Sequence, residues 1–471
     1  MGKVFSIQDF KEGLDVRKTA LTAPGGSLRI LDNAVLTPGG EIEKRLAFVK
    51  MTTLPASTGI IFGQGGKLHV FGIGLGTLDP GTTPHQIVPH ELAVPTGGAP
   101  VHVIDVEAFN EGFYVSGTAA NGAEVIWWNG AIVSEVGGAL STGTYSRTYK
   151  TKMYRTDGKY LRFSGVNDPS VNDPASTASP GAGFINVATN DPDGENVVSM
   201  EIFYDKMAIF ARLMTQLWSL DPDPTKDTLG QVLRIGTVAP HSVLQFGTGD
   251  ILFLSDSGVR SLKSQTVTLT AGVSDVGSAI DPLMTAQIRT NGAAAALAQA
   301  VVQPIAGRYW LALDDKVYTL SYFPAGHITA WSQFTPGFVV QEWATVDNRI
   351  YCRGPDQSLY LYGGVDNLTY DPATIVTVRT PHMEMEGPTT RKRIQSVDVM
   401  CQGAWSVSMG MLPNNTDAFE LVANIQDNTF GIQSIPFAGY GTHVGLELVH
   451  QGPGPALLAS IHLNMQEASI K

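Results

Sequence analysis

Acidic residues are the side chains of this 471-residue chain best suited to catalysis or metal binding. Glu384 and Glu386 have the residue type of a glycosidase acid pair. Asp221, Asp223 and the acidic run 191–195 could offer oxygen ligands to calcium. However, residues i and i+2 of a strand share one face, and Asp-Pro sequences favour turns. These patterns therefore favour a solvated strand face and turns over an acid pair and calcium sites.

Other sequence patterns that carry chemistry are missing or incomplete. The chain has no G-x-S-x-G or H-E-x-x-H sequence, and its ten His residues do not show ligand spacing. A Gly-rich run that ends at Gly66 and Lys67 lacks the flanking residues of a phosphate loop. Cys352 and Cys401 are too few for a disulfide framework, so we expect two small buried side chains. The sequence thus predicts no enzymatic activity, no metal and no cofactor.

Basic residues are few, and the acidic net charge disfavours a nucleic-acid-binding protein. The formal net charge is −12, whereas nucleic-acid binding needs clustered Lys and Arg. The dense basic cluster is Arg391, Lys392 and Arg393, and a second basic pair is Lys44 and Arg45. A solvated strand end is the simpler explanation of the cluster. The alternative is a partner or phosphate contact, which makes these five residues candidate partner contacts. If the partner surface is acidic, docking should depend on salt.

Composition indicates which elements must position these residues. Charged residues make up 16% of the chain, against roughly 25% in typical soluble proteins. The 51 Gly and 27 Pro residues disfavour helical bundles, while 43% hydrophobic residues are sufficient to build cores. The sequence therefore predicts an all-β fold with many turns. The best helix signal covers residues 281–302, where Asp281 and Pro282 begin a segment that becomes rich in alanine.

Pairs of short apolar runs recur along the middle of the chain. The runs alternate with period two, and several pairs are joined by Asp-Gly or Asp-Ser-Gly turns, which suit tight hairpins. The units begin near residues 68, 112, 152, 206, 251, 308 and 349. Spacing of about 40–50 residues with a hairpin in each unit is typical of propeller blades. The pattern predicts a β-propeller of six or seven blades over residues 51–372.

Both ends of the chain differ from this middle. Residues 1–50 are denser in charge, and two Pro-Gly-Gly turns separate their short apolar runs. After residue 372 the apolar runs lose the repeat spacing. We expect residues 373–471 to form a β-sandwich-like platform domain that also takes in strands from residues 1–50.

Four motifs follow one another near the start of the chain. In order, they are Gly13-Leu14-Asp15, Pro24-Gly25, Asn33-Ala34 and Gly40-Glu41-Ile42-Glu43-Lys44-Arg45. Further segments follow at 255–262, 275–277, 307–311 and 330–332. This order resembles the tail nozzle family of short-tailed bacteriophages, also called tail tubular protein B, over much of residues 5–365.

The resemblance implies a structural virion protein without enzymatic activity. Six copies would form a homohexameric ring beneath the adaptor of the portal, as the distal tail tube and gate for genome ejection. The implied partners are the head-to-tail adaptor proteins and phage DNA, which passes without specific binding because an acidic surface repels phosphate. Tail fibres or a tail needle are further implied partners, although the larger family members are longer than this sequence. Lumen residues stay unassigned.

The start of the chain bears on where such a protein is made. It has no continuous apolar segment of the kind found in a secretory signal, and no long apolar span follows. We therefore expect a protein without a membrane anchor that is assembled in the host cytoplasm and located in the virion tail.

Two other functions remain open from the sequence. A carbohydrate-binding or carbohydrate-active propeller, such as a phage adhesin, would need clustered exposed aromatic residues and paired carboxylates in one concave pocket. Its sequence support is one adjacent tryptophan pair, Trp127 and Trp128. An ordinary intracellular propeller scaffold would instead be a monomer without affinity for phage portal or adaptor proteins.

Overall fold

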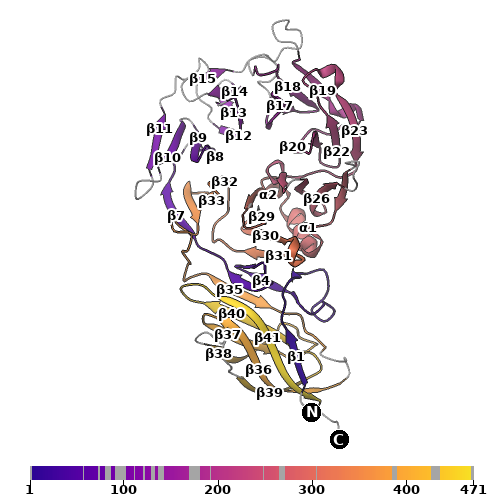
Figure 1. Ribbon diagram of the computed structural model, residues 1–471, viewed down its shortest axis with the longest axis vertical. Helices are drawn as coiled ribbons and strands as arrows, with labels where there is room; N and C mark the ends of the chain where they lie inside the picture. Colours follow the sequence, from indigo (N-terminus) through magenta and orange to yellow (C-terminus); the bar gives the residue numbers. More distant parts are fainter. Residues whose placement is uncertain are drawn as a thin grey trace.

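Antiparallel strands make up most of the chain. The computed structural model describes residues 3–56, 58–72, 75–79, 86–90, 102–110, 112–119, 122–128, 133–135, 143–168, 181–190, 193–247, 249–264, 271–303, 305–384, 390–425 and 435–467. A ring of sheets forms one end of the molecule, and a second β domain at the other end carries both termini (Figure 1). The predicted all-β fold class, a propeller with a second β domain, is confirmed.

Seven blades of four strands surround the axis of the ring; six are separate four-stranded sheets, and the sixth blade, residues 299–334, is part of an eleven-stranded sheet. Their innermost strands contact one another in a closed circle, from β8 through β12, β16, β20, β24, β28 and β32 back to β8. From axis to rim, the first three blades are β8 (Ile60–Gln64), β9 (Lys67–Phe71), β10 (Leu75–Asp79) and β11 (Gln86–His90); β12 (His102–Phe109), β13 (Gly112–Ala119), β14 (Gly122–Trp128) and β15 (Val133–Glu135); and β16 (Ser146–Tyr149), β17 (Lys152–Asp157), β18 (Tyr160–Phe163) and β19 (Gly183–Asn186).

The remaining blades repeat this order. They are β20 (Ser199–Phe203), β21 (Lys206–Phe210), β22 (Thr215–Ser219) and β23 (Thr228–Leu233); β24 (Leu244–Phe246), β25 (Asp250–Ser255), β26 (Gly258–Ser264) and β27 (Ala271–Ser274); β28 (Gln299–Gln303), β29 (Arg308–Leu313), β30 (Lys316–Phe323) and β31 (Ile328–Phe334); and β32 (Glu342–Val346), β33 (Arg349–Arg353), β34 (Ser358–Tyr362) and β7 (Phe48–Thr53). Hairpins predicted from the sequence form the second and third strands of a blade, as in β17 and β18.

The seventh blade closes the ring with a strand from the other end of the propeller sequence. Strand β7 pairs antiparallel with β34, and Phe48 lies opposite Tyr362. The Phe48 ring also packs against Trp310, Phe338 and Trp343, with ring centroids 6.4, 5.8 and 6.3 Å away. The propeller therefore begins at Phe48, a few residues before the predicted boundary.

Two sheets pack face to face in the second domain, which is called the platform below. One sheet contains β39 (Ile435–Gly441), β36 (Lys392–Gln402), β41 (Leu457–Glu467), β6 (Ile42–Lys44), β5 (Ala34–Leu36) and β1 (Lys3–Ile7). The other contains β4 (Ile30–Asp32), β35 (Ile375–Arg379), β40 (Gly445–Gln451), β37 (Trp405–Gly410) and β38 (Glu420–Ile425). Strands from the first fifty residues thus lie among C-terminal strands in both sheets.

The propeller and the platform share one sheet. Strand β31, the rim strand of the sixth blade, pairs in parallel with β4 through Gln333 and Asp32, and with β2 (Gly13–Leu14) through Trp331 and Gly13. Strand β2 also pairs with β3 (Ser27–Leu28). Because β4 pairs onward with β35, the sheet continues from the propeller axis into the platform (Figure 1).

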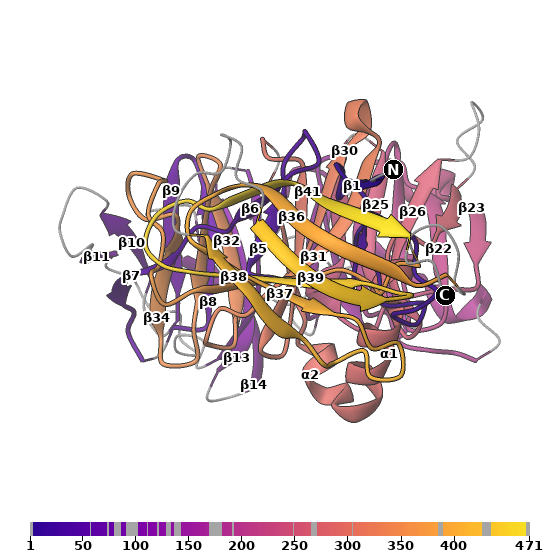
Figure 2. The same cartoon turned by 90° about the horizontal axis from the view of Figure 1, so that it is seen from below.

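Helices are short, and two of them protrude from one face of the ring (Figure 2). The α-helices are α1 (Asp281–Thr290) and α2 (Gly292–Ala296), and the 3-10 helices are η2 (Val187–Asn190), η3 (Pro224–Lys226), η4 (Pro240–Ser242), η5 (Ser278–Ile280) and η6 (Pro324–Gly326). The predicted helix 281–302 is confirmed over α1 and α2 and is wrong after Ala296. Asn291 separates the two helices and caps α2, because its side chain accepts a hydrogen bond from the Ala294 amide, and residues 299–303 form the axial strand β28.

Candidate functional site

Lys44 and Arg45, which we predicted to be partner contacts, are buried where the platform meets the propeller. Their exposed fractions are 2% and 4%. Lys44 Nζ donates hydrogen bonds to the carbonyl oxygens of Asp371 (3.1 Å) and Gly452 (2.7 Å). Burial lowers the pKa of both basic groups. The prediction is wrong for these two residues, because their hydrogen-bonding capacity is used inside the chain.

The side chain of Asn33 makes three hydrogen bonds beside Arg45 and is called the Asn33 hub below. The side-chain oxygen of Asn33 accepts hydrogen bonds from Arg45 Nε (2.8 Å) and from the Thr335 amide (3.0 Å). The Asn33 amide nitrogen donates to the Ile375 carbonyl at 2.9 Å. The Arg45 guanidinium lies over the Phe48 ring at 5.2 Å. One asparagine thus connects the N-terminal segment, the platform and the propeller.

The Gly13-Leu14-Asp15 motif contacts β31, the rim strand of the sixth blade. Gly13 has φ +58°, and a Cβ atom there would lie 2.7 Å from the Trp331 carbonyl oxygen and 2.8 Å from the Ala330 Cβ. Glycine is therefore required by both conformation and space. Asp15 accepts a hydrogen bond from Arg17 Nε at 3.0 Å. Although burial opposes its charge, Arg17 lowers the pKa of the Asp15 carboxyl.

In the basic cluster Arg391, Lys392 and Arg393, successive side chains point to opposite faces of strand β36. Lys392 is buried in β36, with an exposed fraction of 2%, and its Nζ donates to the Glu384 carbonyl at 2.6 Å. The prediction of a partner contact is therefore wrong for Lys392. Arg391 and Arg393 are exposed, and the Arg393 guanidinium lies over the Tyr440 ring at 5.7 Å. These two residues remain candidate partner contacts.

The acidic candidates show turn chemistry where the structure describes them. Asp223 Oδ1 accepts the Thr225 amide at 3.1 Å and caps η3, and Asp221 Oδ1 accepts the Asp223 amide at 2.9 Å. The turn interpretation is confirmed for this pair. Glu384 is exposed, whereas Glu386 and Asp191 lie outside the described residues. Within the described ranges, no group of three or more His, Cys, Asp or Glu side chains could hold a metal ion.

Both cysteines have the predicted environment. Cys352 and Cys401 are buried, each with an exposed fraction of 0%. Burial raises the pKa of the Cys352 thiol well above its usual value, which suppresses the reactive thiolate. The two side chains therefore act as small hydrophobic residues in the core.

A partly buried ionic cluster at the propeller axis was missed by the sequence analysis. Arg147 on β16 reaches Glu107 Oε2 on β12 at 3.3 Å and Glu201 Oε2 on β20 at 3.4 Å. Burial raises the pKa of Glu107 to about 7. Burial opposes the Arg147 charge, but the two carboxylates raise the pKa of its guanidinium. One guanidinium thus connects the axial strands of three successive blades.

A second ionic contact connects the last blade to the first. Glu342 Oε2 on β32 accepts the Ile61 amide of β8 at 3.0 Å and lies 3.7 Å from Arg353 Nε. Arg353 Nη2 also donates to the Gly59 carbonyl at 2.6 Å. Burial raises the pKa of Glu342 to about 8. In the sequence, the signal that could have indicated this contact is Glu342, a charged residue next to the apolar residues of the strand before a hairpin.

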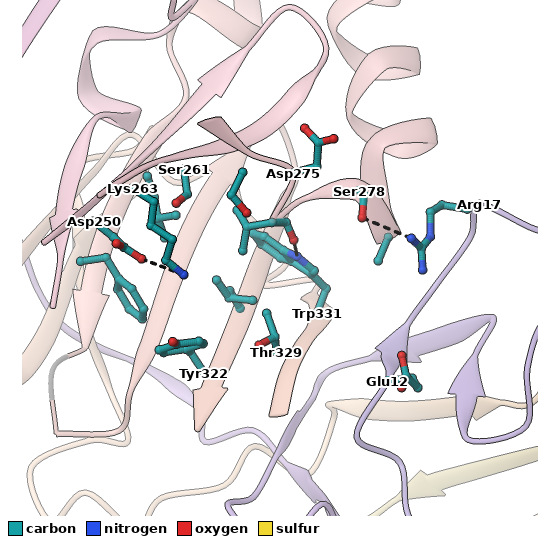
Figure 3. A pocket seen from close by; sticks show the side chains of 16 residues that line it. Glu12, Arg17, Asp250, Ser261, Lys263, Asp275, Ser278, Tyr322, Thr329 and Trp331 are labelled. Atoms are coloured by element: carbon teal, nitrogen blue, oxygen red, sulfur yellow. Dashed lines mark hydrogen bonds and ion pairs between the residues drawn. The ribbon is translucent and has the colours of Figure 1, made fainter. Parts of the chain in front are cut away.

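A pocket of about 340 Å³ lies between the fifth and sixth blades and the N-terminal segment (Figure 3). Asp250 Oδ2 and Lys263 Nζ are 3.3 Å apart, and Lys263 Nζ lies 5.8 Å from the centre of the Tyr322 ring. Phe246 meets Tyr322 edge-on with centroids 5.7 Å apart. The same four residues also line a neighbouring groove of about 660 Å³. This surface combines aromatic rings with an ion pair.

Comparisons with known proteins identify similar architectures. No family model and no curated protein matches the chain. Similar solved structures include YCF48 bound to D1 peptide (8% identity, TM-score 0.39, 73% of this chain and 99% of that chain) and BamB from Moraxella catarrhalis (10%, 0.39, 68% and 97%). The Pan2 WD40 domain of Neurospora crassa is 9% identical, with a TM-score of 0.42 over 69% and 96%. Among the described residues, no helix is sufficiently long and apolar to cross a membrane.

Proposed function

We propose that this chain is the tail nozzle subunit of a short-tailed bacteriophage. In this role it forms a homohexameric ring below the head-to-tail adaptor and conducts DNA during ejection. The observation that carries the proposal is the ordered motif series, whose residues Gly13, Asn33, Lys44 and Arg45 all lie at the junction of propeller and platform. Residues that match a family pattern and share one structural task support the resemblance more than scattered matches would.

A rigid junction suits a tube that must keep its shape while DNA passes. The continuous sheet through β31, β4 and β35 and the Asn33 hub both resist rotation of the platform against the propeller. The net charge of −12 suits a wall that does not hold phosphate groups. Both features support a conduit that guides DNA without binding it.

Reconstitution with phage components tests the proposal. The purified chain should join a portal–adaptor complex of its phage and sediment with it, and it should not join the portal without the adaptor. A matched variant, Gly13→Ala, should reduce joining because the added Cβ displaces β31 at the junction. A chain that stays monomeric and does not bind the portal–adaptor complex would instead be an ordinary propeller scaffold.

Carbohydrate binding is the second candidate function, and the groove beside Phe246 and Tyr322 favours it. Aromatic rings beside Asp250 and Lys263 offer both stacking and hydrogen bonding to a sugar. Asp250 is already paired with Lys263, so the groove favours binding over hydrolysis. A glycan array with the wild-type chain and the Tyr322→Ala variant tests this function. Saturable binding that the substitution removes would support carbohydrate binding. An array without binding would exclude it for the glycans displayed.

A further inference from the structure

An apolar cavity of about 440 Å³ opens at the propeller axis, on the side of helix α2. Its walls come from the axial strands of several blades and from the segment that follows α2. The apolar wall residues include Ile60, Val103, Leu297, Val339 and Val340. Leu297 is 73% exposed and Val339 is 40% exposed, which is costly for apolar side chains without a partner. The cavity thus offers uncovered apolar surface.

Three polar groups of this cavity keep unused hydrogen-bonding capacity. Glu342 engages Ile61 and Arg353 through Oε2, and no described residue donates a hydrogen bond to its Oε1. His241 meets Tyr145 edge-on at 5.2 Å, and neither side chain has a hydrogen-bond partner among the described residues. Burial lowers the pKa of His241, so its ring is neutral near pH 7 and retains an acceptor nitrogen.

The charges at the cavity leave an excess of acidic groups. Glu342 and the exposed Asp314 contribute two carboxyl groups, while Arg353 contributes one guanidinium. The Arg353 guanidinium is already used by Gln341 Oε1 at 2.8 Å, Gly59 O at 2.6 Å and the Glu342 ion pair. A ligand cation therefore meets free acceptors and an aromatic ring. A ligand anion would find the Arg353 Nη atoms engaged, and Arg353 Nε, which has no hydrogen-bond partner within the described part of the chain, is buried 3.7 Å from Glu342.

We propose that the axial cavity binds an apolar chain that ends in a cation, an alkylammonium group of the kind found in a lysine side chain or a free amine. The carbon chain lies along Leu297, Val103 and Val339. The ammonium group lies between Glu342 Oε1, the neutral His241 ring and the Tyr145 ring. This binding site is separate from the junction and from the pocket of Figure 3.

Three six-carbon probes that differ in their polar end test the proposal. Titration calorimetry with the full chain at pH 8.5 uses hexylammonium, hexan-1-ol and hexanoate, because at this pH Glu342 is largely ionised while the amine stays protonated. We expect hexylammonium to bind about ten-fold more tightly than hexan-1-ol, and hexanoate to bind most weakly. Competition by acetyl-Ala-Lys-Ala-amide would assign the site to a protein-borne lysine, and failure to compete would assign it to free amines.

Matched variants separate the carboxylate from the apolar walls. Glu342→Gln should weaken hexylammonium binding about ten-fold and change hexan-1-ol binding less than about two-fold. Leu297→Ala, at an exposed position, should weaken all three probes together. Glu420→Gln removes an exposed carboxylate of the platform and should change nothing. Equal binding of hexanoate and hexylammonium, no binding of hexylammonium, or unchanged binding in a folded Glu342→Gln variant would overturn the proposal.

Discussion

Arg45 and Arg393 carry the same charge, but the surrounding chain gives them different tasks. Removing Arg45 leaves Asn33 Oδ1 and the Thr335 carbonyl without one of their donors in a buried junction. Arg45→Ala should therefore lower the free energy of unfolding by about 2–4 kcal/mol. Arg393→Ala removes an exposed side chain and should change it by less than about 0.5 kcal/mol. Urea unfolding of both variants checks this difference, and equal effects would contradict the assignment of Arg45 to the junction.

Glu342 gives the propeller a pH-dependent stability. Its pKa is raised from 4.5 to about 8 in the folded chain, so the folded state holds its proton more tightly than the unfolded state. Between about pH 4.5 and 8, the wild type should therefore lose stability relative to Glu342→Gln as pH rises, by an amount on the order of 1–3 kcal/mol. Thermal melts of both proteins from pH 5 to 9 measure this difference. A difference that is constant with pH would show that Glu342 has an ordinary pKa.

The sequence could not distinguish these buried charges from exposed ones. Lys44, Arg45 and Lys392 looked like the surface charges of partner contacts because their burial depends on residues far away, such as Gly452 and Thr335. The axial cluster was missed for the same reason, since Glu107, Arg147 and Glu201 come together only when the blades close. Local chemistry was more predictable: the turn at Asp223 and the buried cysteines followed from residue type and neighbours.

Strand β7 determines whether the propeller stays closed. Phe48 on β7 packs against four aromatic rings of the sixth and seventh blades and their connection, including Tyr362 at 5.3 Å. Phe48→Ala should lower the free energy of unfolding by about 2–4 kcal/mol, because it removes a partly buried ring that packs against an aromatic core and weakens ring closure. Phe184 is a matched control on β19, another rim strand, where its side chain is 52% exposed. Phe184→Ala should cost less than about 1 kcal/mol. Similar losses in calorimetry would show that closure does not depend on β7.

Hairpins were the predictable elements, and long-range strand pairs were not. Period-two runs joined by a short turn, such as β25 and β26 around Asp256 and Gly258, contain their own pairing information. The partners of β7, β4 and β1 lie hundreds of residues away, and no local pattern specifies them. The last residues of the predicted helix were wrong for a related reason, since residues 299–303 form the axial strand β28 by pairing with β29.

The exposed end of β36 is the remaining candidate contact with an acidic partner. Arg391 and Arg393 face solvent, while Lys392 between them faces the core. Replacing both arginines with alanine should weaken adaptor binding several-fold at low salt and much less at high salt, because surface charges are screened. Binding measured in 50 and 500 mM salt tests this expectation. A double variant that binds as the wild type at both concentrations would leave these residues as solvated surface.

The proposed tail nozzle role requires the whole chain to be one rigid unit of a larger tube. A propeller and a platform that share a sheet can present two separate surfaces in a fixed relation, which a repeating ring requires. If the tube conducts DNA, its inner wall should carry mainly negative potential, since a basic wall would bind phosphate and hold the DNA. We expect propeller loops, which move more readily than packed strands, to form its distal constriction.

An electron microscopy reconstruction of the chain assembled on its adaptor complex would decide whether this protein is a tail nozzle. We expect a closed ring of six chains below the adaptor, with an open lumen on the six-fold axis and platform contacts between neighbouring chains. We also expect a mainly negative inner wall. A single unassembled chain, or propellers attached at the periphery with no shared lumen, would contradict the claim that this protein is a tail nozzle.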